Sequence, residues 1–251
     1  MKIVLFAVLL SFCARVVEAQ VFEKTDSLRG QEDMYRFKAK KLVVPAVFVG
    51  LGAMGLVDPH LKRLNQSTQY ESSEHVMPGA QIDNYMQYAP AAAVYVLNGL
   101  GVKGKHNFKD RTIIYATSQL LTAAVVFPMK NILKEERPDG ANSLSFPSGH
   151  TATAFSSAQF MFREYRDENF WLSVCGYPVA AATGMYRVFN NRHWLGDIVA
   201  GAGIGILTTE AAYWLFPVVS KIFPKGHDKQ PYCVIPSYQP GRVGVSVMKT
   251  F

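Results

Sequence analysis

Cysteine and long unbroken hydrophobic runs are both scarce in this chain. Its 251 residues include three cysteines, and no spacing of cysteine with histidine is typical of a zinc site. Cys175 and Cys233 could pair in an oxidising compartment, or Cys175 could simply be packed in an apolar helix. Several apolar stretches are shorter than the roughly 20 residues of a membrane span or carry polar residues such as Gln119 and Glu210. Their length alone favours a soluble or shallow bundle.

Acidic residues are fewer than basic ones. The chain has 26 Lys and Arg against 19 Asp and Glu, which gives a net charge of +7 at pH 7. This charge is spread along the chain, without an arginine-rich block or a nucleic-acid motif. We therefore expect attraction to phosphate or to a membrane surface, and no nucleic-acid partner. Linkers and internal repeats are also lacking within the chain, which predicts a single domain.

Three short polar segments interrupt the otherwise apolar sequence, at residues 130–138, 145–151 and 187–197. A transferring phosphoryl group spreads negative charge over its oxygens, so a protein that works without a metal must surround it with cations and N–H donors. The segments supply three cations, two histidines and one aspartate: Lys130, Arg137, Arg187, His150, His193 and Asp197. They predict a phosphoryl-transfer site that uses neither a metal nor a cofactor.

The first two segments predict an anion-binding pocket. Lys130 and Arg137 are seven residues apart, so one helix would present both on the same side, and the following proline would end it. Ser148 precedes an apolar run and is typical of a helix N-cap, which leaves N–H groups free at Gly149 and His150. A helix N-terminus of this kind binds anions.

The third segment predicts a nucleophile. His193 and Asp197 are four residues apart, close enough on one helical face for the carboxylate to accept a hydrogen bond from one ring nitrogen. The other nitrogen would then be free to attack. His150 could donate a proton to the leaving oxygen, since histidine titrates near ~6.5. Each feature alone is typical of an ordinary helix surface or cap, but their combination at the ends of apolar helices favours catalysis.

The ordered pattern resembles that of the type 2 phosphatidic acid phosphatases, which share a fold with vanadium-dependent haloperoxidases and bacterial class A acid phosphatases. The family pattern is K-x6-R-P, then P-S-G-H, then S-R-x5-H-x3-D, and the resemblance covers about residues 41–223. One departure is Tyr186, which stands where the family has serine. We expect this change to alter local packing or a secondary phosphate contact, and not the chemistry.

The resemblance also implies a role for each matching residue. It implies that His193 forms a phosphohistidine, that His150 protonates the leaving group and that Asp197 supports His193. The phosphate would be held by the three cations and the turn before the helix, namely Lys130, Arg137, Arg187, Ser148 and Gly149.

Six apolar stretches predict an all-α, six-helix bundle of this family's type: residues 42–57, 89–102, 112–129, 151–162, 170–185 and 198–219. The polar connection at residues 58–88 is long enough to cap the mouth of the site, although a plain surface loop is an equal alternative. The expected organisation is a signal peptide, a polar lead-in, a helical phosphatase domain and a C-terminal extended tail or hairpin, over residues 1–19, 20–41, 42–223 and 224–251.

The membrane topology gives conflicting signals. Residues 1–19 are typical of a secretory signal cleaved before Gln20, with an uncleaved membrane anchor as the alternative. Basic residues gather in alternate connections, which favours helices that span a membrane with an outward-facing site. A cleaved signal followed by six spans would instead place the three polar segments inside. We expect a cell-envelope protein whose site faces the periplasm, either embedded in the membrane or associated with it, with a soluble periplasmic protein as the alternative.

These features predict a metal-independent phosphatase that acts on a phosphomonoester or pyrophosphate, with a phosphorylated lipid and a membrane as its partners. Lipid A, isoprenyl pyrophosphates, phosphatidic acid and phosphatidylglycerophosphate all fit. A soluble acid phosphatase of broad specificity is the first alternative. A vanadate-dependent haloperoxidase is the second, and it is disfavoured because this short chain lacks the large additional helical regions of those enzymes.

Overall fold

A computed structural model describes residues 35–73, 81–223, 232–239 and 242–249, the last two ranges as strands. The chain divides into a helical unit that ends at Pro217 and a second unit from Val218 onwards. The predicted signal peptide at residues 1–19, and most of the lead-in at 20–41, lie outside the described residues.

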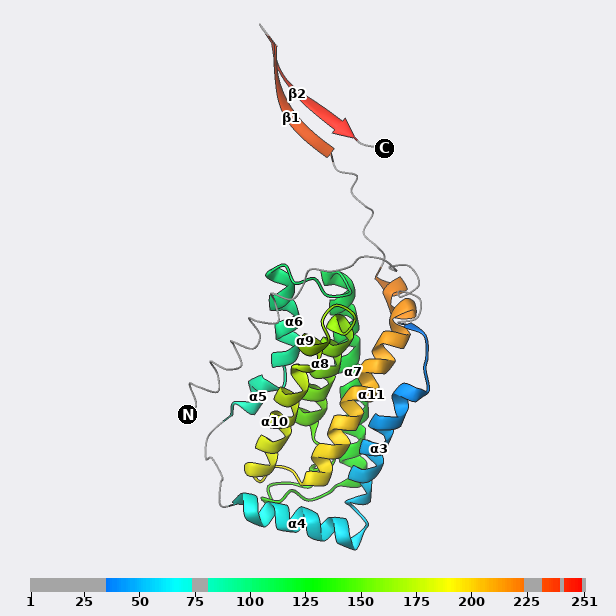
Figure 1. Ribbon diagram of the computed structural model, residues 1–251, viewed down its shortest axis with the longest axis vertical. Helices are drawn as coiled ribbons and strands as arrows, with labels where there is room; N and C mark the ends of the chain where they lie inside the picture. Colours follow the sequence, from blue (N-terminus) through cyan, green and yellow to red (C-terminus); the bar gives the residue numbers. More distant parts are fainter. Residues whose placement is uncertain (1–34, 74–80, 224–231, 240–241, 250–251) are drawn as a thin grey trace. The chain divides into compact units, whose positions relative to one another are not determined.

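The helical unit confirms the all-α prediction (Figure 1). Five of the six apolar stretches form one helix each, and the stretch at 170–185 is divided between two helices at Cys175. Two further helices lie within the 58–88 connection, where a loop was an open alternative. With the labels of Figure 1, the helices are α3 (Lys40–Met54), α4 (Pro59–Ser73), α5 (Asp83–Met86), α6 (Ala89–Gly99), α7 (Phe108–Leu133), α8 (Gly149–Tyr165), α9 (Phe170–Val174), α10 (Gly176–Phe189) and α11 (Leu195–Val219).

Polar side chains set the starts of several helices. The Asn107 side chain accepts a hydrogen bond from the Asp110 N–H at 2.9 Å and caps α7. Asn169 caps α9 in the same way. The other end of α7 is set by Lys134, whose φ of 49° is left-handed and cannot continue the helix. These local signals fix where the helices stop, and therefore where the loops of the site begin.

Helix α8 lies at the centre of the unit, where it packs against α6, α7, α9 and α10. Small residues let α11 approach it closely. A Cβ atom added at Gly201 would lie 2.6 Å from the Ser148 carbonyl oxygen, and one added at Gly205 would lie 2.8 Å from the Ser156 nitrogen. Real Cβ atoms do not approach so closely, so glycine is required at both positions. This close contact places the first residues of α8 beside the first turns of α11.

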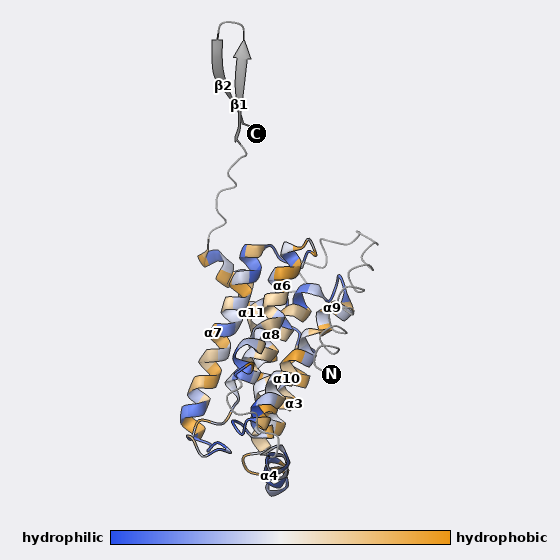
Figure 2. Cartoon of the chain, turned by 90° about the vertical axis from the view of Figure 1, so that its left-hand side faces the viewer, coloured by the Kyte–Doolittle hydropathy of each residue, from blue (hydrophilic) through white to orange (hydrophobic). Residues whose placement is uncertain are grey.

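Two helices are long and apolar enough to cross a membrane, Phe108–Leu133 and Leu195–Ile222, by length and composition. A third span would need α3 and α4 together, which are bent by 86°. Hydrophobic residues appear along α7 and hydrophilic ones gather on α4 (Figure 2). On α7, Leu120, Phe127 and Ile132 expose 71, 64 and 77% of their surface, as expected for a helix that faces lipid. The helical unit is that of a membrane-embedded protein.

The second unit contains an antiparallel hairpin of β1 (Tyr232–Gln239) and β2 (Arg242–Lys249). Tyr232 pairs with Lys249 and Gln239 pairs with Arg242, so the two strands match along their whole length. The hairpin confirms the expectation of extended structure near the C-terminus.

The glycine contact between α8 and α11 gives a prediction about stability. Gly205→Ala should lower the free energy of unfolding by about 1–3 kcal/mol, because the added methyl group overpacks the interface. Gly99→Ala is the matched control, since a Cβ atom at Gly99 meets nothing within 4 Å. Thermal unfolding of both variants in detergent would check this. Equal midpoints for the two variants would contradict the packing argument.

Candidate functional site

The third polar segment places a buried histidine against a buried carboxylate. His193 and Asp197 are 2% and 1% exposed, and His193 Nδ1 lies 3.4 Å from Asp197 Oδ2. The same oxygen accepts hydrogen bonds from Ser145 Oγ at 2.5 Å and from the Trp194 N–H at 3.0 Å. Helix α11 begins at Leu195, so the prediction that both residues lie on one helical face was wrong. The pair forms across the start of the helix instead.

The P-S-G-H turn is held beside this pair by the backbone. The Ser148 N–H donates to the Asp197 carbonyl oxygen at 3.1 Å. Ser148 Oγ accepts from the Thr151 N–H at 3.4 Å, which confirms the predicted N-cap. Gly149 and His150 are the first residues of α8, where N–H groups have no partner within the helix. The amide-lined end of α8 therefore lies close to the His193 pair.

The two cations of the first polar segment, Lys130 and Arg137, lie on different structural elements. Lys130 is in the last turn of α7, and its Nζ donates to the carbonyl oxygens of Leu144 and Ser145 at 2.6 and 3.1 Å. Arg137 lies in the loop beyond Lys134, so the prediction that one helix presents both cations was wrong. Burial and the neighbouring Arg187 guanidinium lower the pKa of Arg137. The cations of separate elements are thus close enough to repel one another.

Among the described residues, three guanidinium groups carry a buried donor without a hydrogen-bond partner: Arg111, near the start of α7, and Arg137 and Arg187 at the predicted site. Arg137 Nε and Arg187 Nε are buried, and neither has a hydrogen-bond partner among the residues that the structure describes. Leaving such a donor unpaired costs about 1–3 kcal/mol, and more for a charged group. Buried polar groups are rarely left so. The two unpaired Nε donors of Arg137 and Arg187, which lie among neighbouring cations, are therefore suited to bind an anion.

Three further residues contact the site and were not identified from the sequence. Asp83 Oδ2, on α5, accepts from Arg187 Nη1 at 2.5 Å. Asn84 Oδ1 lies 2.7 Å from His150 Nε2. Ser145, which contacts Asp197, belongs to the second polar segment, and its position beside the P-S-G-H turn was a signal that could have found it. The two α5 residues lie far from the motifs along the chain, and no spacing marks them.

The capping role of the 58–88 connection stays a prediction, and the structure shows a contact between α4 and α11. Asn65 Oδ1 accepts a hydrogen bond from the Gly196 N–H at 3.0 Å, one residue before Asp197. Helix α4 therefore contacts the first turn of α11, and Gln69 Nε2 of α4 donates to Asn191 Oδ1 in the preceding loop at 3.5 Å. Tyr186 is half-buried on α10 next to Arg187, and its expected effect on packing stays a prediction.

Burial determines the charge of both histidines. The pKa of His193 is lowered to about 4 by burial, with the nearby Lys130 and Arg187 acting in the same direction and Asp197 opposing them. The pKa of His150 is also lowered to about 4, by burial and then by Arg187, while Asp83 opposes the shift. Without a ligand, both rings are therefore neutral at pH 7. A neutral His193 whose Nδ1 is bound to Asp197 has the form of a nucleophile.

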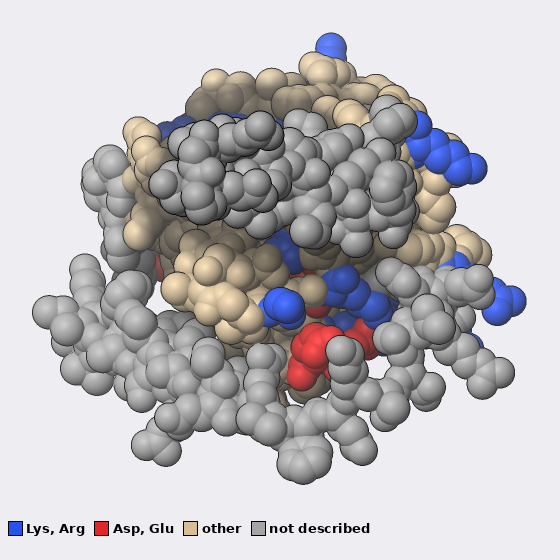
Figure 3. All heavy atoms as spheres, turned by 90° about the horizontal axis from the view of Figure 1, so that it is seen from above, with Lys and Arg blue, Asp and Glu red and all other residues tan. Residues whose placement is uncertain are grey.

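A separate cavity of about 360 Å³ lies between α3, α8, α10 and α11, and it contains none of the predicted site residues. Its lining residue Glu210 pairs with Lys41, which also lines the cavity, at 3.3 Å and with the neighbouring Arg163 at 2.5 Å. Basic side chains beside a smaller acidic patch appear on the end of this unit seen in Figure 3. Asp167 pairs with both Lys105 and Arg166 beyond the end of α8. The unpaired Nε donors of Arg137 and Arg187 lie elsewhere, at the predicted site, whereas the unpaired Nη1 of Arg111 lies near the start of α7.

Comparisons with known proteins agree with the motif pattern. The model of the PAP2 superfamily matches residues 111–221. A lipid A 1-phosphatase of Porphyromonas gingivalis is 39% identical over 140 residues, which are 55% of this chain and 32% of that protein. One from Helicobacter pylori is 33% identical over 73 residues, 29% of this chain and 36% of that protein. The chain thus spans about a third of the length of these relatives.

One solved structure is similar over much of its length. The crystal structure of Aquifex aeolicus LpxE superposes with a TM-score of 0.45 at 21% identity, covering 59% of this chain and 94% of that chain.

The charge state of the histidines gives a prediction that needs no substrate. In NMR titrations of the ligand-free protein, the rings of His150 and His193 should stay neutral until the pH falls towards about 4. Saturating inorganic phosphate should raise the pKa of His150, because the anion offsets the surrounding cations. His150→Asn and His193→Asn would assign the signals. Titration of both rings near the ordinary ~6.5 would contradict the burial argument.

Proposed function

We propose that this chain is a member of the PAP2 superfamily, whose model matches residues 111–221, and that it hydrolyses the phosphate ester of a lipid within a helical domain at residues 42–223. The observation that carries this proposal is the pair of buried, unpartnered Nε donors of Arg137 and Arg187 beside the His193–Asp197 pair, within the described residues. Such a pocket can hold a phosphoryl group and present a nucleophile to it without a metal.

In the proposed reaction, neutral His193 attacks phosphorus through Nε2 while Asp197 holds its Nδ1–H. A nitrogen–phosphorus bond forms as the bond between phosphorus and the lipid oxygen breaks, and His150 gives a proton to that oxygen. In the second step, His150 takes a proton from water as the water oxygen attacks phosphorus. The nitrogen–phosphorus bond then breaks, which releases inorganic phosphate and returns His193 to its starting form.

The substrate supplies the charge that this proton transfer requires. His150 is neutral at pH 7 in the empty site because burial and Arg187 lower its pKa. A bound phosphate dianion neutralises nearby cations and favours the protonated ring, and a phosphate monoanion brings the proton itself, since the second ionisation of a phosphate ester is near ~6. Either route gives a protonated His150 only when substrate is present.

Several observations support a lipid as the substrate. Two helices are long and apolar enough to cross a membrane, and a relative that is 39% identical over 140 residues is a lipid A 1-phosphatase. We therefore place the 1-phosphate of lipid A first. Isoprenyl pyrophosphates, phosphatidic acid and phosphatidylglycerophosphate are the other candidates. The distribution of basic residues supports a site that faces the periplasm.

The nucleophile can be tested directly. His193→Ala should lower the rate of phosphate release by at least about 10³-fold, because it removes the group that forms the covalent intermediate. His60→Ala, which removes an exposed histidine of α4, should retain the wild-type rate. The assay measures phosphate release in EDTA from lipid A, the other candidate lipids and a soluble aryl phosphate.

The substrate panel separates the alternatives. Preference for lipid A over the other lipids would support the first candidate, and a preference for another lipid would replace it. Equal or faster release from the aryl phosphate would indicate a soluble-type acid phosphatase. Phosphate release that survives His193→Ala would refute the proposed nucleophile.

A further inference from the structure

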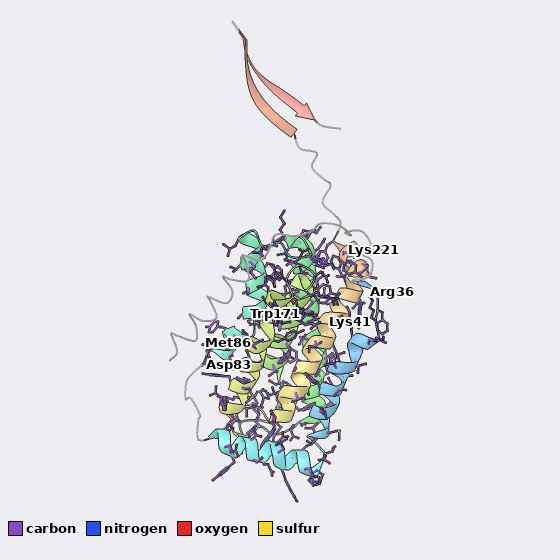
Figure 4. The ribbon with its side chains drawn as sticks, in the orientation of Figure 1. Arg36, Lys41, Asp83, Met86, Trp171 and Lys221 are labelled. Carbon is purple, nitrogen blue, oxygen red and sulfur yellow. The ribbon has the colours of Figure 1, made fainter. Side chains whose placement is uncertain are left out.

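Asp83 is a buried carboxylate that the proposed chemistry does not yet use. It is the first residue of α5, is 2% exposed, and belongs to a short helix that packs against α8 and α10. In Figure 4, Asp83 and Met86 mark α5 at the side of the helical unit. Burying a carboxylate is costly unless it is paired. Its partners should therefore reveal what it does.

The first partner is Arg187, which uses one part of its guanidinium group for Asp83. Arg187 Nη1 donates to Asp83 Oδ2 at 2.5 Å, whereas Arg187 Nε is buried without a partner among the described residues. A guanidinium group is rigid and planar, so fixing one nitrogen fixes the direction of the others. Asp83 thus orients Arg187 and leaves Nε free for a phosphate oxygen. A carboxylate that competed with the phosphate would be expected to occupy that donor.

The second partner is His150. Its Nε2 lies 4.0 Å from Asp83 Oδ2 and 2.7 Å from Asn84 Oδ1, so neighbouring residues of α5 face the same ring nitrogen. The other charged groups that act on this ring are the cations of three elements, Arg187, Arg137 and Lys130, and all of them disfavour its protonation. Asp83 is the group that opposes them. An opposite charge at this distance favours the protonated ring.

We propose that Asp83 is a positioning residue of the phosphatase reaction, which fixes the Arg187 guanidinium for the phosphate and supplies the negative charge beside His150. This inference rests on the proposed function. It assigns a role to a residue of α5, which lies outside the three polar segments. Asp83 touches neither the phosphorus nor the leaving oxygen. It acts through the two residues that do.

Three substitutions separate the two effects. Asp83→Asn keeps an oxygen that can accept from Arg187 but removes the charge, so it should lower kcat about tenfold with little change in KM. It should also shift the alkaline limb of the profile of kcat against pH to lower pH by about one unit, since His150 loses its proton more readily. Asp83→Ala also removes the acceptor and should weaken the binding of inorganic vanadate by about tenfold. Asp83→Glu should recover part of the pH profile.

The matched control is Asp167→Asn, which removes another carboxylate paired with an arginine, Arg166, beyond the far end of α8. It should leave kcat, KM and the pH profile unchanged. NMR titration of His150 in wild type and Asp83→Asn measures the same charge effect without turnover. A lower pKa of His150 in Asp83→Asn is the expected result, and an unchanged value would overturn the inference.

The outcomes distinguish this inference from the proposed function. If the wild type releases no phosphate from any substrate, the proposed function fails, and the His150 titration with the vanadate affinities still decides whether Asp83 positions these groups. If the wild type is active but Asp83→Ala binds vanadate more tightly and retains kcat, Asp83 competes with the phosphate, and the positioning role is refuted.

Discussion

The buried carboxylate of Asp197 is the contact on which the site depends. Oδ2 of this carboxylate accepts hydrogen bonds from Ser145 Oγ and from the Trp194 N–H, and it lies 3.4 Å from Nδ1 of His193. The backbone carbonyl oxygen of Asp197 accepts a hydrogen bond from the Ser148 N–H. It therefore joins the loop before α8, the start of α11 and the histidine. Removing a buried acceptor with several donors leaves each donor unsatisfied. Glycines on α11 allow the close approach that this set of contacts requires.

The direction of each helix adds to the attraction for an anion. Helices α8 and α11 begin at the site, so their positive ends point towards it. Helices α7 and α10 end there, and their last turns carry Lys130 and Arg187, which offset the negative ends of these two helices. The predicted site residues from separate parts of the chain thus meet because alternate helix ends lie at one end of the bundle.

The sequence predicted which segments form helices and which residue types belong to the site. It predicted less well how the site residues are arranged in space. The six apolar stretches located the helices, and Ser148 marked the start of α8 because capping is a local interaction. The left-handed conformation of Lys134 ended α7 early, so Arg137 reaches the site from a loop. Asp83 contacts Arg187 across 104 residues of sequence. Such a pairing depends on the packing of α5 against α10, which no local pattern encodes.

Charge balance explains why the site needs both an acidic neighbour and an anionic ligand. Lys130, Arg137 and Arg187 repel one another, and burial removes much of the water that would screen them. Asp83 and Asp197 offset part of this charge, so the excess remains positive and is relieved when a phosphate enters. Because the transferring phosphoryl group spreads its charge over oxygens that face fixed donors, cations held rigidly by neighbouring carboxylates stabilise that state with little rearrangement. In the proposed reaction, Asp83 and Asp197 therefore assist catalysis by limiting how far the cations can move.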